Sequence, residues 1–130
     1  MTYVPVVYQE FHKGCKEIRV TVVGDRVFGT QFENEVIGDW HRSDRKKFNC
    51  VVHRLPSEIE NACIKYLRKL DLVYGAFDFL LTEKGEYIFL ELNSYGDWRW
   101  IENITKQPIT QTIIDYCKSI LSNKNIEAVK

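Results

Sequence analysis

The stretch YGAFDFLLTEKGEYIFLELN, residues 74–93, has the pattern of two β-strands joined by a tight turn. Lys84 and Gly85 interrupt two runs of apolar and aromatic residues, and such a pair is typical of a β-hairpin turn. If these two residues form the centre of the turn, counting outward along both strands sets the register. The predicted pairs are Glu83 with Glu86, Phe79 with Leu90, Asp78 with Glu91, and Ala76 with Asn93. The stretch therefore predicts a hairpin in which two carboxylates face each other.

The two faces of this predicted hairpin differ in polarity, because side chains alternate between the faces of a strand. The face expected to be entirely apolar carries Phe77, Phe79, Leu81, Ile88, Leu90 and Leu92. The face expected to be polar at one end carries Asp78, Glu91 and Asn93, beside Leu80 and Phe89. The hairpin therefore presents one face suited to burial and one face with three oxygen-bearing side chains.

The facing carboxylates of Asp78 and Glu91 need compensation, since like charges directly opposite each other destabilise a sheet. A hard divalent cation would provide it, and oxygen ligands without His or Cys favour Mg²⁺ or Mn²⁺ over Zn²⁺. Mg²⁺ is normally held by one or two carboxylates plus substrate phosphates, so this cation would imply a nucleotide. The alternative is that the carboxylates are solvated, or paired with Arg19 or Arg42. Spacing alone does not separate these interpretations.

Regular patterns elsewhere predict more strands and two helices. Strands are expected at 4–10, 17–23, 26–33 and near 48–52. Apolar residues at helical spacing predict a helix that ends near Leu70, started by a capping box of Ser57 and Glu60. The side chains expected to point inward from a last helix, over about 108–121, are Ile109, Ile113, Cys117, Ile120 and Leu121. The sequence therefore predicts a single α+β domain, residues 1–130, with an antiparallel β-sheet and helices packed on one face.

Composition limits the classes of function. The 130 residues carry 18 basic and 18 acidic side chains, so no excess of positive charge indicates a nucleic-acid surface. No apolar run is long enough to cross a membrane, and no signal-peptide pattern follows Met1. The four cysteines include no Cys-x-x-Cys pair and no zinc-knuckle spacing. Buried free thiols in a cytoplasmic protein are the favoured interpretation, with Cys63 and Cys117 on the apolar stripes of the two helices.

Several motifs of this chain resemble those of the ATP-grasp ligases and occur in the same order along the sequence. Asp78 in GAFDF, followed by Glu91-Leu92-Asn93, resembles the metal-binding signature of that superfamily. The upstream motifs that resemble its hinge strand, its ribose-binding element and its phosphate-binding segment are Tyr8-Gln9-Glu10-Phe11, Glu17-Ile18-Arg19 and Asp39-Trp40-His41-Arg42. Each motif is weak by itself, but together they cover nearly the whole chain.

The resemblance implies a role for each matched residue. Mg²⁺ or Mn²⁺ would be held by Asp78, Glu91 and Asn93. ATP would be held through its adenine by Gln9, Glu10 and Phe11, through its ribose by Glu17, and through its phosphates by the catalytic residues Arg19 and Arg42. The resemblance also implies a preceding lobe with a glycine-rich lid, which this chain lacks. The chain is therefore expected to be the C-terminal part of an enzyme and inactive alone.

The stretch NSYGDWRWIE, residues 93–102, refines the resemblance. It resembles the Asn-x-x-Gly-x-Trp-x-Trp-Ile-Glu segment of the peptide-maturing ATP-grasp ligases, the microviridin-type and grasp-with-spasm enzymes, whereas the ribosomal-protein glutamate ligases have a Pro-Gly turn there. The implied reaction activates carboxylates of a precursor peptide as acyl phosphates and passes them to an amine or a hydroxyl. Trp98 and Trp100 either contact that peptide or pack within the protein. A glutamate-ligase part and a non-catalytic module that binds nucleotide or peptide remain as alternatives.

Overall fold

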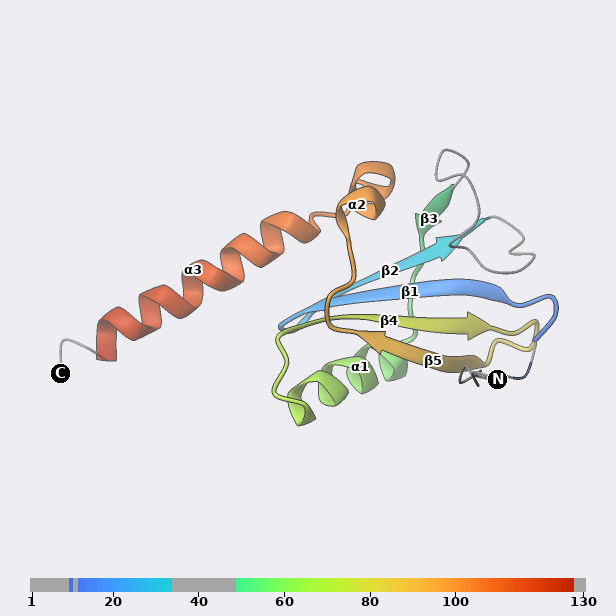
Figure 1. The fold of residues 1–130 in the computed structure, drawn as a ribbon, viewed down its shortest axis with the longest axis horizontal. Helices are drawn as coiled ribbons and strands as arrows, with labels where there is room; N and C mark the ends of the chain where they lie inside the picture. The colour runs from blue at the N-terminus through green and yellow to red at the C-terminus, as the bar shows by residue number, and fades with distance from the viewer. Residues whose placement is uncertain (1–9, 11, 34–48, 128–130) are drawn as a thin grey trace, which may run out of the picture.

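The computed structural model describes residues 10, 12–33 and 49–127, which form one five-stranded antiparallel sheet and three helices (Figure 1). The strands are β1 (Lys16–Val23), β2 (Arg26–Phe32), β3 (Cys50–Val52), β4 (Tyr74–Leu81) and β5 (Tyr87–Asn93). The helices are α1 (Ser57–Lys69), α2 (Arg99–Thr105) and α3 (Ile109–Glu127). The strand order is β3-β2-β1-β4-β5, and the expected α+β fold with an antiparallel sheet is confirmed. The strand expected at 4–10 falls, except for Glu10, outside the described residues.

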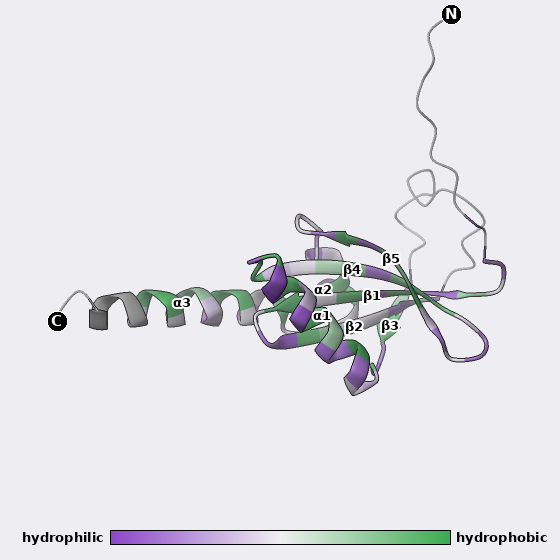
Figure 2. Cartoon of the chain, turned by 90° about the horizontal axis from the view of Figure 1, so that it is seen from below, coloured by the Kyte–Doolittle hydropathy of each residue, from purple (hydrophilic) through white to green (hydrophobic). Residues whose placement is uncertain are grey.

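The main core lies between α1 and one face of the sheet (Figure 2). Alternation along β1 places Ile18, Val20 and Val22 on this face, where all three are buried. Cys63 and Leu67 of α1 belong to the same cluster. The burial of Cys63 agrees with the sequence prediction and raises the pKa of its thiol to about 11. The helix predicted after residue 56 thus covers the apolar face of the sheet, as expected.

A smaller core covers one end of the opposite face. Val23 follows Val22 in β1 and therefore points to the other side of the sheet, where it is buried with Phe28 of β2. Ile101 of α2 and Ile109 of α3 complete this cluster. Besides the expected layer formed by α1, the molecule thus has a second contact between helices and sheet, which the sequence pattern did not predict. This contact leaves the polar end of the β4–β5 hairpin on the same face as α2.

The polar end of the β4–β5 hairpin has the predicted register. The pairs Ala76 with Asn93 and Asp78 with Glu91 are confirmed. Nearer the turn the prediction is wrong by one residue, because Phe79 lies opposite Phe89 and not opposite Leu90. Leu90 is the extra residue of a β-bulge, which shifts the register between the two halves of the hairpin.

The turn explains why a bulge is needed. It contains three residues and not two, since the N–H of Thr82 donates to the carbonyl of Glu86, where the prediction paired Glu83 with Glu86. Gly85 ends this loop with a φ of +83°, a left-handed conformation that glycine adopts without strain. The longer turn displaces the register by one residue, and the bulge at Leu90 restores it before the carboxylates.

The bulge also exchanges two side chains between the faces of the hairpin. Phe89 was expected on the polar face, but its ring lies 6.0 Å from that of Tyr66 in α1. Ile88 was expected on the apolar face, but it pairs with Leu80 on the other side. The predicted faces are therefore wrong at these two positions and correct for Asp78 and the residues beyond it.

The start of α1 differs in detail from the prediction. The helix begins at Ser57, but Pro56 takes the position before the first turn and no side chain caps the helix. The N–H groups of Ile59 and Glu60 donate to the carbonyl of Pro56. The predicted capping box of Ser57 and Glu60 is therefore wrong, although the position of the helix is correct.

The last helix, α3, leaves the body of the molecule after its first turns (Figures 1 and 2). Ile109 is buried and Ile113 packs against the smaller core, as predicted. Cys117, Ile120 and Leu121 are exposed, so the predicted inward orientation of these three side chains is wrong. The helix has 19 residues and runs past the end of the sheet, so the sheet cannot cover its second half. In the described part of the chain, no helix is both long and apolar enough to cross a membrane.

Candidate active site

Three charged side chains form a row across the face of the sheet opposite α1. Arg19 of β1 lies opposite Asp78 of β4, and Asp78 lies opposite Glu91 of β5. Arg19 stands between Ile18 and Val20, which point into the core under α1, so alternation directs the arginine to the other face. These three residues, called the charged row from here on, are brought together by the pairing of β1 with β4.

Arg19 and Asp78 form a part-buried bidentate ion pair. Nε and Nη2 of Arg19 donate to Oδ1 and Oδ2 of Asp78, each at 2.8 Å. The two side chains are 11% and 19% exposed, whereas Glu91 is exposed. Paired N–H···O bonds of this kind are among the stronger hydrogen bonds of proteins. The structure thus contains the pair of Asp78 with Arg19, one of the two arginines that the sequence offered as partners.

Glu17 adds a third carboxylate to this region. It precedes Arg19 by two residues in β1, on the same face, and lies opposite Leu80. Burial raises the pKa of Glu17, the charge of Asp78 raises it further, and the charge of Arg19 lowers it. The residue to which the resemblance assigned the ribose therefore interacts electrostatically with the charged row.

Thr30 and Gln107 lie on the other side of Arg19 and were missed by the sequence analysis. Thr30 lies opposite Arg19 on β2 and is 1% exposed. Its hydroxyl donates to Oε1 of Gln107 at 3.0 Å, and Nε2 of Gln107 donates to the carbonyl of Gly29 at 3.2 Å. Gln107 thereby fastens the connection between α2 and α3 to β2, at the strand position opposite Arg19. The polar Gln-Pro pair before α3 was the available signal, and it does not identify a partner on a distant strand.

Asn93 lies further along β5, on the same face as the charged row, and is paired with Ala76. Its Oδ1 atom accepts a hydrogen bond from the N–H of Tyr95 at 2.8 Å. The hydroxyl of Tyr74 donates to the carbonyl of Gly96, and burial raises the pKa of Tyr74 to about 12, so this phenol keeps its proton at neutral pH. The turn that follows β5 is therefore held at both of its ends.

The oxygen atoms of Asp78, Glu91 and Asn93 suit a hard cation such as Mg²⁺ or Mn²⁺. Among the described residues, no group of three or more His, Cys, Asp or Glu side chains could hold a metal ion, whereas the predicted set has two carboxylates and one amide. Both oxygens of Asp78 accept hydrogen bonds from Arg19, yet each carboxylate oxygen has a second lone pair. A cation would share Asp78 with Arg19, and the assignment of these three ligands stays a prediction.

The tryptophans of the segment after β5 pack within the protein. The ring of Trp100 stacks on that of Phe32 with centroids 5.6 Å apart, and Trp98 meets Tyr74 edge-on at 5.4 Å. Tyr95 differs from both, because it is 95% exposed. Packing is therefore what the structure shows for Trp98 and Trp100, and Tyr95 is the aromatic side chain that this segment presents at the surface.

Glu102, the last residue of that segment, closes a set of hydrogen bonds at the start of α3. Its Oε1 accepts from the N–H of Thr110 at 3.2 Å, and its Oε2 accepts from the hydroxyl of Thr110. The same hydroxyl accepts from Nε1 of Trp98 at 3.0 Å. These bonds, called the Thr110 clasp from here on, give the Trp-x-Trp-Ile-Glu pattern a structural role in joining α2 to α3.

Of the predicted residues not yet placed, Glu10 is the one that the structure describes. The side chain of Glu10 is 83% exposed, and its Oε2 atom lies 4.0 Å from Nε2 of His12. Gln9, Phe11 and Arg42 lie outside the described residues. The assignments of adenine to Gln9, Glu10 and Phe11, and of phosphate to Arg42, therefore stay predictions.

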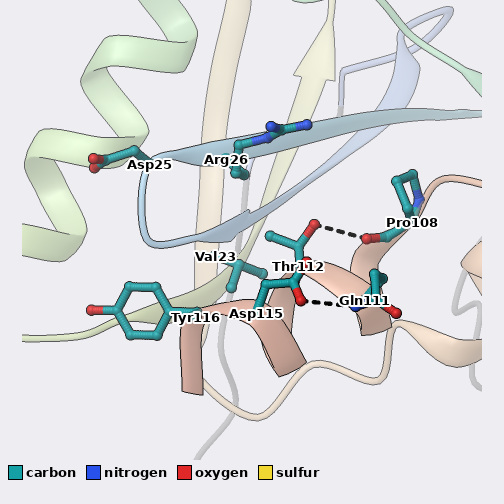
Figure 3. Close-up of a pocket in the computed structure, with 8 residues that line it drawn as sticks. All are labelled: Val23, Asp25, Arg26, Pro108, Gln111, Thr112, Asp115 and Tyr116. Carbon is teal, nitrogen blue, oxygen red and sulfur yellow. Dashed lines mark hydrogen bonds between the residues drawn. The ribbon is translucent and has the colours of Figure 1, made fainter. Parts of the chain in front are cut away.

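A hollow of about 440 Å³ lies away from the charged row, between the β1–β2 turn and α3 (Figure 3). The residues that line it are Val23, Asp25, Arg26, Pro108, Gln111, Thr112, Asp115 and Tyr116. Of the predicted site residues that the structure describes, none is among them. The hollow results from the way in which α3 docks on the β1–β2 hairpin, and it is separate from the candidate site.

The chain is similar over most of its length to curated proteins named as ligases. A probable alpha-L-glutamate ligase of Photobacterium profundum is 26% identical over 122 residues, and one of Shewanella sp. is 29% identical over 128 residues. These alignments cover 92% and 95% of this chain but 40% and 42% of the relatives. The chain thus spans about two fifths of the length of these relatives.

Solved structures share the fold and part of the sequence. Macrocyclase MdnC bound with precursor peptide MdnA, from Microcystis aeruginosa, is 32% identical with a TM-score of 0.65, over 77% of this chain and 32% of that one. A RiPP-associated ATP-grasp ligase of Chryseobacterium gregarium, in complex with ADP and a leader and core peptide, is 28% identical with a TM-score of 0.63, over 80% and 33%. The family model described as the RimK-like ATP-grasp domain matches residues 2–117. This chain therefore belongs to the RimK-like ATP-grasp domain family.

Proposed function

We propose that this chain is the nucleotide- and cation-binding part of an ATP- and Mg²⁺-dependent ligase, which joins carboxylates of a ribosomally made precursor peptide to an amine or a hydroxyl. The observation that carries the proposal is the position of the charged row and Asn93 on one face of the sheet, directly before the turn that exposes Tyr95. Membership of the ATP-grasp family supports ATP as the co-substrate.

The proposed roles follow from the chemistry of the side chains. Asp78, Glu91 and Asn93 hold the cation, which neutralises charge on the phosphates when it is bound. Arg19 provides a fixed positive charge in the same row, and Glu17 binds the ribose hydroxyls. These groups contribute by positioning the reactants and by neutralising charge, with no covalent bond to the protein.

The proposed reaction has two steps. An oxygen of the substrate carboxylate attacks the γ-phosphorus of ATP, and ADP leaves, which produces an acyl phosphate. The amine or hydroxyl then attacks the acyl carbon, inorganic phosphate leaves with the bonding electron pair, and the proton of the nucleophile passes to water. Each amide or ester formed within a peptide therefore removes the elements of one water from that peptide.

A peptide substrate is favoured by the surroundings of Asn93. Tyr95 is exposed two residues after this proposed cation ligand, and its N–H is held by the side chain of Asn93. An aromatic ring with a polar tip suits contact with an extended peptide. Macrocyclases MdnC and MdnB are 32% and 33% identical to the aligned part of this chain, and MdnC was solved with its precursor peptide.

A second candidate is the transfer of glutamate to a protein or peptide. It is favoured by the curated relatives, at 26% and 29% identity, that are named probable alpha-L-glutamate ligases. The same residues would bind the cation and the nucleotide in both cases. The candidates differ in the carboxylate that is activated and therefore in the mass of the product.

Mass spectrometry separates the two candidates. The chain is co-expressed with the genes that flank its own, including any that encodes the rest of the ligase and the neighbouring short reading frames, and the encoded peptides are weighed. We expect a peptide that has lost one or more waters, and we expect this loss to disappear with Glu91→Gln. Glu83→Gln changes a carboxylate at the hairpin turn and is the matched control, which should leave the product unchanged. A gain of glutamate residues would favour the second candidate, and no change in any peptide would contradict both.

A further inference from the structure

Arg19 neutralises Asp78 from within the sheet. The two residues are partners across β1 and β4, and the guanidinium reaches both oxygens of the carboxylate at 2.8 Å. Arg19 is 9% exposed and lies between Thr30 on one side and Asp78 on the other. This pair has two hydrogen bonds and is part-buried, unlike an exposed ion pair between two mobile side chains.

The charges around Arg19 are unbalanced. Glu17 lies two residues away on the same strand and face, and Glu91 lies opposite Asp78, so three carboxylates surround one guanidinium. Arginine keeps its positive charge in proteins, and here that charge is hydrogen-bonded to both oxygens of Asp78. The guanidinium is therefore held as a cation at the place where the carboxylates converge.

We propose that Arg19 is a positioning residue whose positive charge balances the carboxylates of the proposed cation site. It fixes the side chain of Asp78 and, by its charge, lowers the affinity of the site for a free divalent cation. This inference rests on the proposed role of Asp78 and Glu91 as cation ligands. In the cation-free protein the guanidinium takes the place of the metal charge, and a bound cation must share Asp78 with it.

Competition between the guanidinium of Arg19 and a divalent cation for Asp78 has a consequence that can be measured. A divalent cation bound to Asp78 would stand within a few ångströms of the guanidinium, and like charges at such a separation repel each other strongly. Removal of Arg19 should therefore strengthen cation binding while it weakens the cation-free fold, because three carboxylates are then left without their counter-ion. A purely structural arginine would have the opposite effect on binding, since loss of the ordered Asp78 side chain would weaken the site.

The experiment titrates Mn²⁺ alone, without nucleotide, into the wild-type chain and its variants. Arg19→Met keeps an unbranched stem and removes the charge, whereas Arg19→Lys keeps the charge but replaces the planar fork by a single ammonium. Arg26→Met, at the exposed start of β2, is the matched control for loss of one positive charge. Free Mn²⁺ is measured by electron paramagnetic resonance, and the melting temperature is recorded with and without the cation.

We expect Arg19→Met to bind Mn²⁺ about tenfold more tightly than the wild type, which corresponds to about 1.4 kcal/mol. Its melting temperature without cation should be lower, Arg19→Lys should bind with intermediate affinity, and Arg26→Met should bind like the wild type. If Arg19→Met does not fold, the affinity of Arg19→Lys for Mn²⁺ tests the proposal, which requires binding tighter than that of the wild type.

Equal or weaker binding by the Arg19 variants would overturn the proposal. If Asp78→Asn combined with Glu91→Gln still removed Mn²⁺ binding in that case, the cation site itself would stand. An absence of Mn²⁺ binding in every variant would overturn both this proposal and the assignment of the cation ligands.

Discussion

The Nε2 atom of His53 lies 2.6 Å from the hydroxyl of Tyr87, so the residue that follows β3 is hydrogen-bonded to β5, the strand at the opposite edge of the sheet. Tyr87 packs against the core under α1, and Leu55, two residues after His53, belongs to that core. The bond thus joins the two edges of the sheet beside the main core.

The stability of the chain should fall in mild acid because of His53. Burial lowers the pKa of His53 below 6.5, and the charge of Lys16 lowers it further. The unfolded chain therefore binds this proton more readily, so the stabilisation is complete above pH 6.5 and is lost as the pH falls through the folded pKa. We expect the melting temperature to decrease between about pH 8 and about pH 5, and His53→Asn to reduce that decrease. A His53→Asn chain with the wild-type pH profile would contradict this prediction.

Divalent cations should raise the melting temperature of the chain. A ligand that binds the folded state and not the unfolded state stabilises it by mass action, so the increase should grow with the concentration of Mg²⁺ or Mn²⁺. Asp78→Asn combined with Glu91→Gln should remove the increase. Glu83→Gln combined with Glu86→Gln neutralises two carboxylates at the turn of the same hairpin and should retain it. A full increase in the first double variant would refute the cation assignment.

Loss of the Thr110 clasp should destabilise the packing of α2 and α3 on the sheet. Thr110→Val keeps the shape of the side chain but removes the hydroxyl that joins Trp98 to Glu102. We expect a decrease of about 1 kcal/mol in the free energy of unfolding, measured by urea denaturation. Thr112→Val removes a single hydroxyl contact, to the carbonyl of Pro108, and should cost less. Equal losses for the two variants would argue against the clasp.

Substitution of Tyr95 should affect substrate binding and not stability. The side chain is 95% exposed, so Tyr95→Ala should change the free energy of unfolding by less than about 0.5 kcal/mol. If the ring contacts the peptide, the same variant should bind it about tenfold more weakly, as is typical of an aromatic contact. Tyr95→Phe should keep most of the affinity. The measurement is calorimetry with the peptide identified by mass spectrometry, and unchanged affinity of Tyr95→Ala would exclude the contact.

The β4–β5 hairpin shows which parts of a site can be predicted from a sequence. The alternation of apolar and polar residues predicts the positions of both strands, and the pairing of Asp78 with Glu91 is confirmed. The predicted length of the turn was wrong, because a glycine at position 85 is compatible with both a two-residue and a three-residue loop. A bulge at Leu90 leaves no distinct pattern either, so two side chains were assigned to the wrong face.

Contacts between distant segments account for the other differences. The pairing of Arg19 with Asp78 depends on β1 lying beside β4, and no local pattern specifies that neighbour. The hydrogen bond between Thr30 and Gln107 likewise joins segments that are far apart in the sequence, so no local pattern predicts it. The exposure of Leu121 depends on where the sheet ends and not on the helical period, which continues along α3 regardless.

The β-bulge at Leu90 separates the turn of the hairpin from its polar end, and this bears on insertions and deletions. Deletion of Leu90 would give a regular ladder in which Glu91 still faces Asp78. The number of residues on the turn side of Glu91 can therefore vary by one among related chains while the carboxylates keep their alignment. A residue gained or lost between Glu91 and Asn93 would place one of the two on the opposite face, so we expect related chains to keep that spacing fixed.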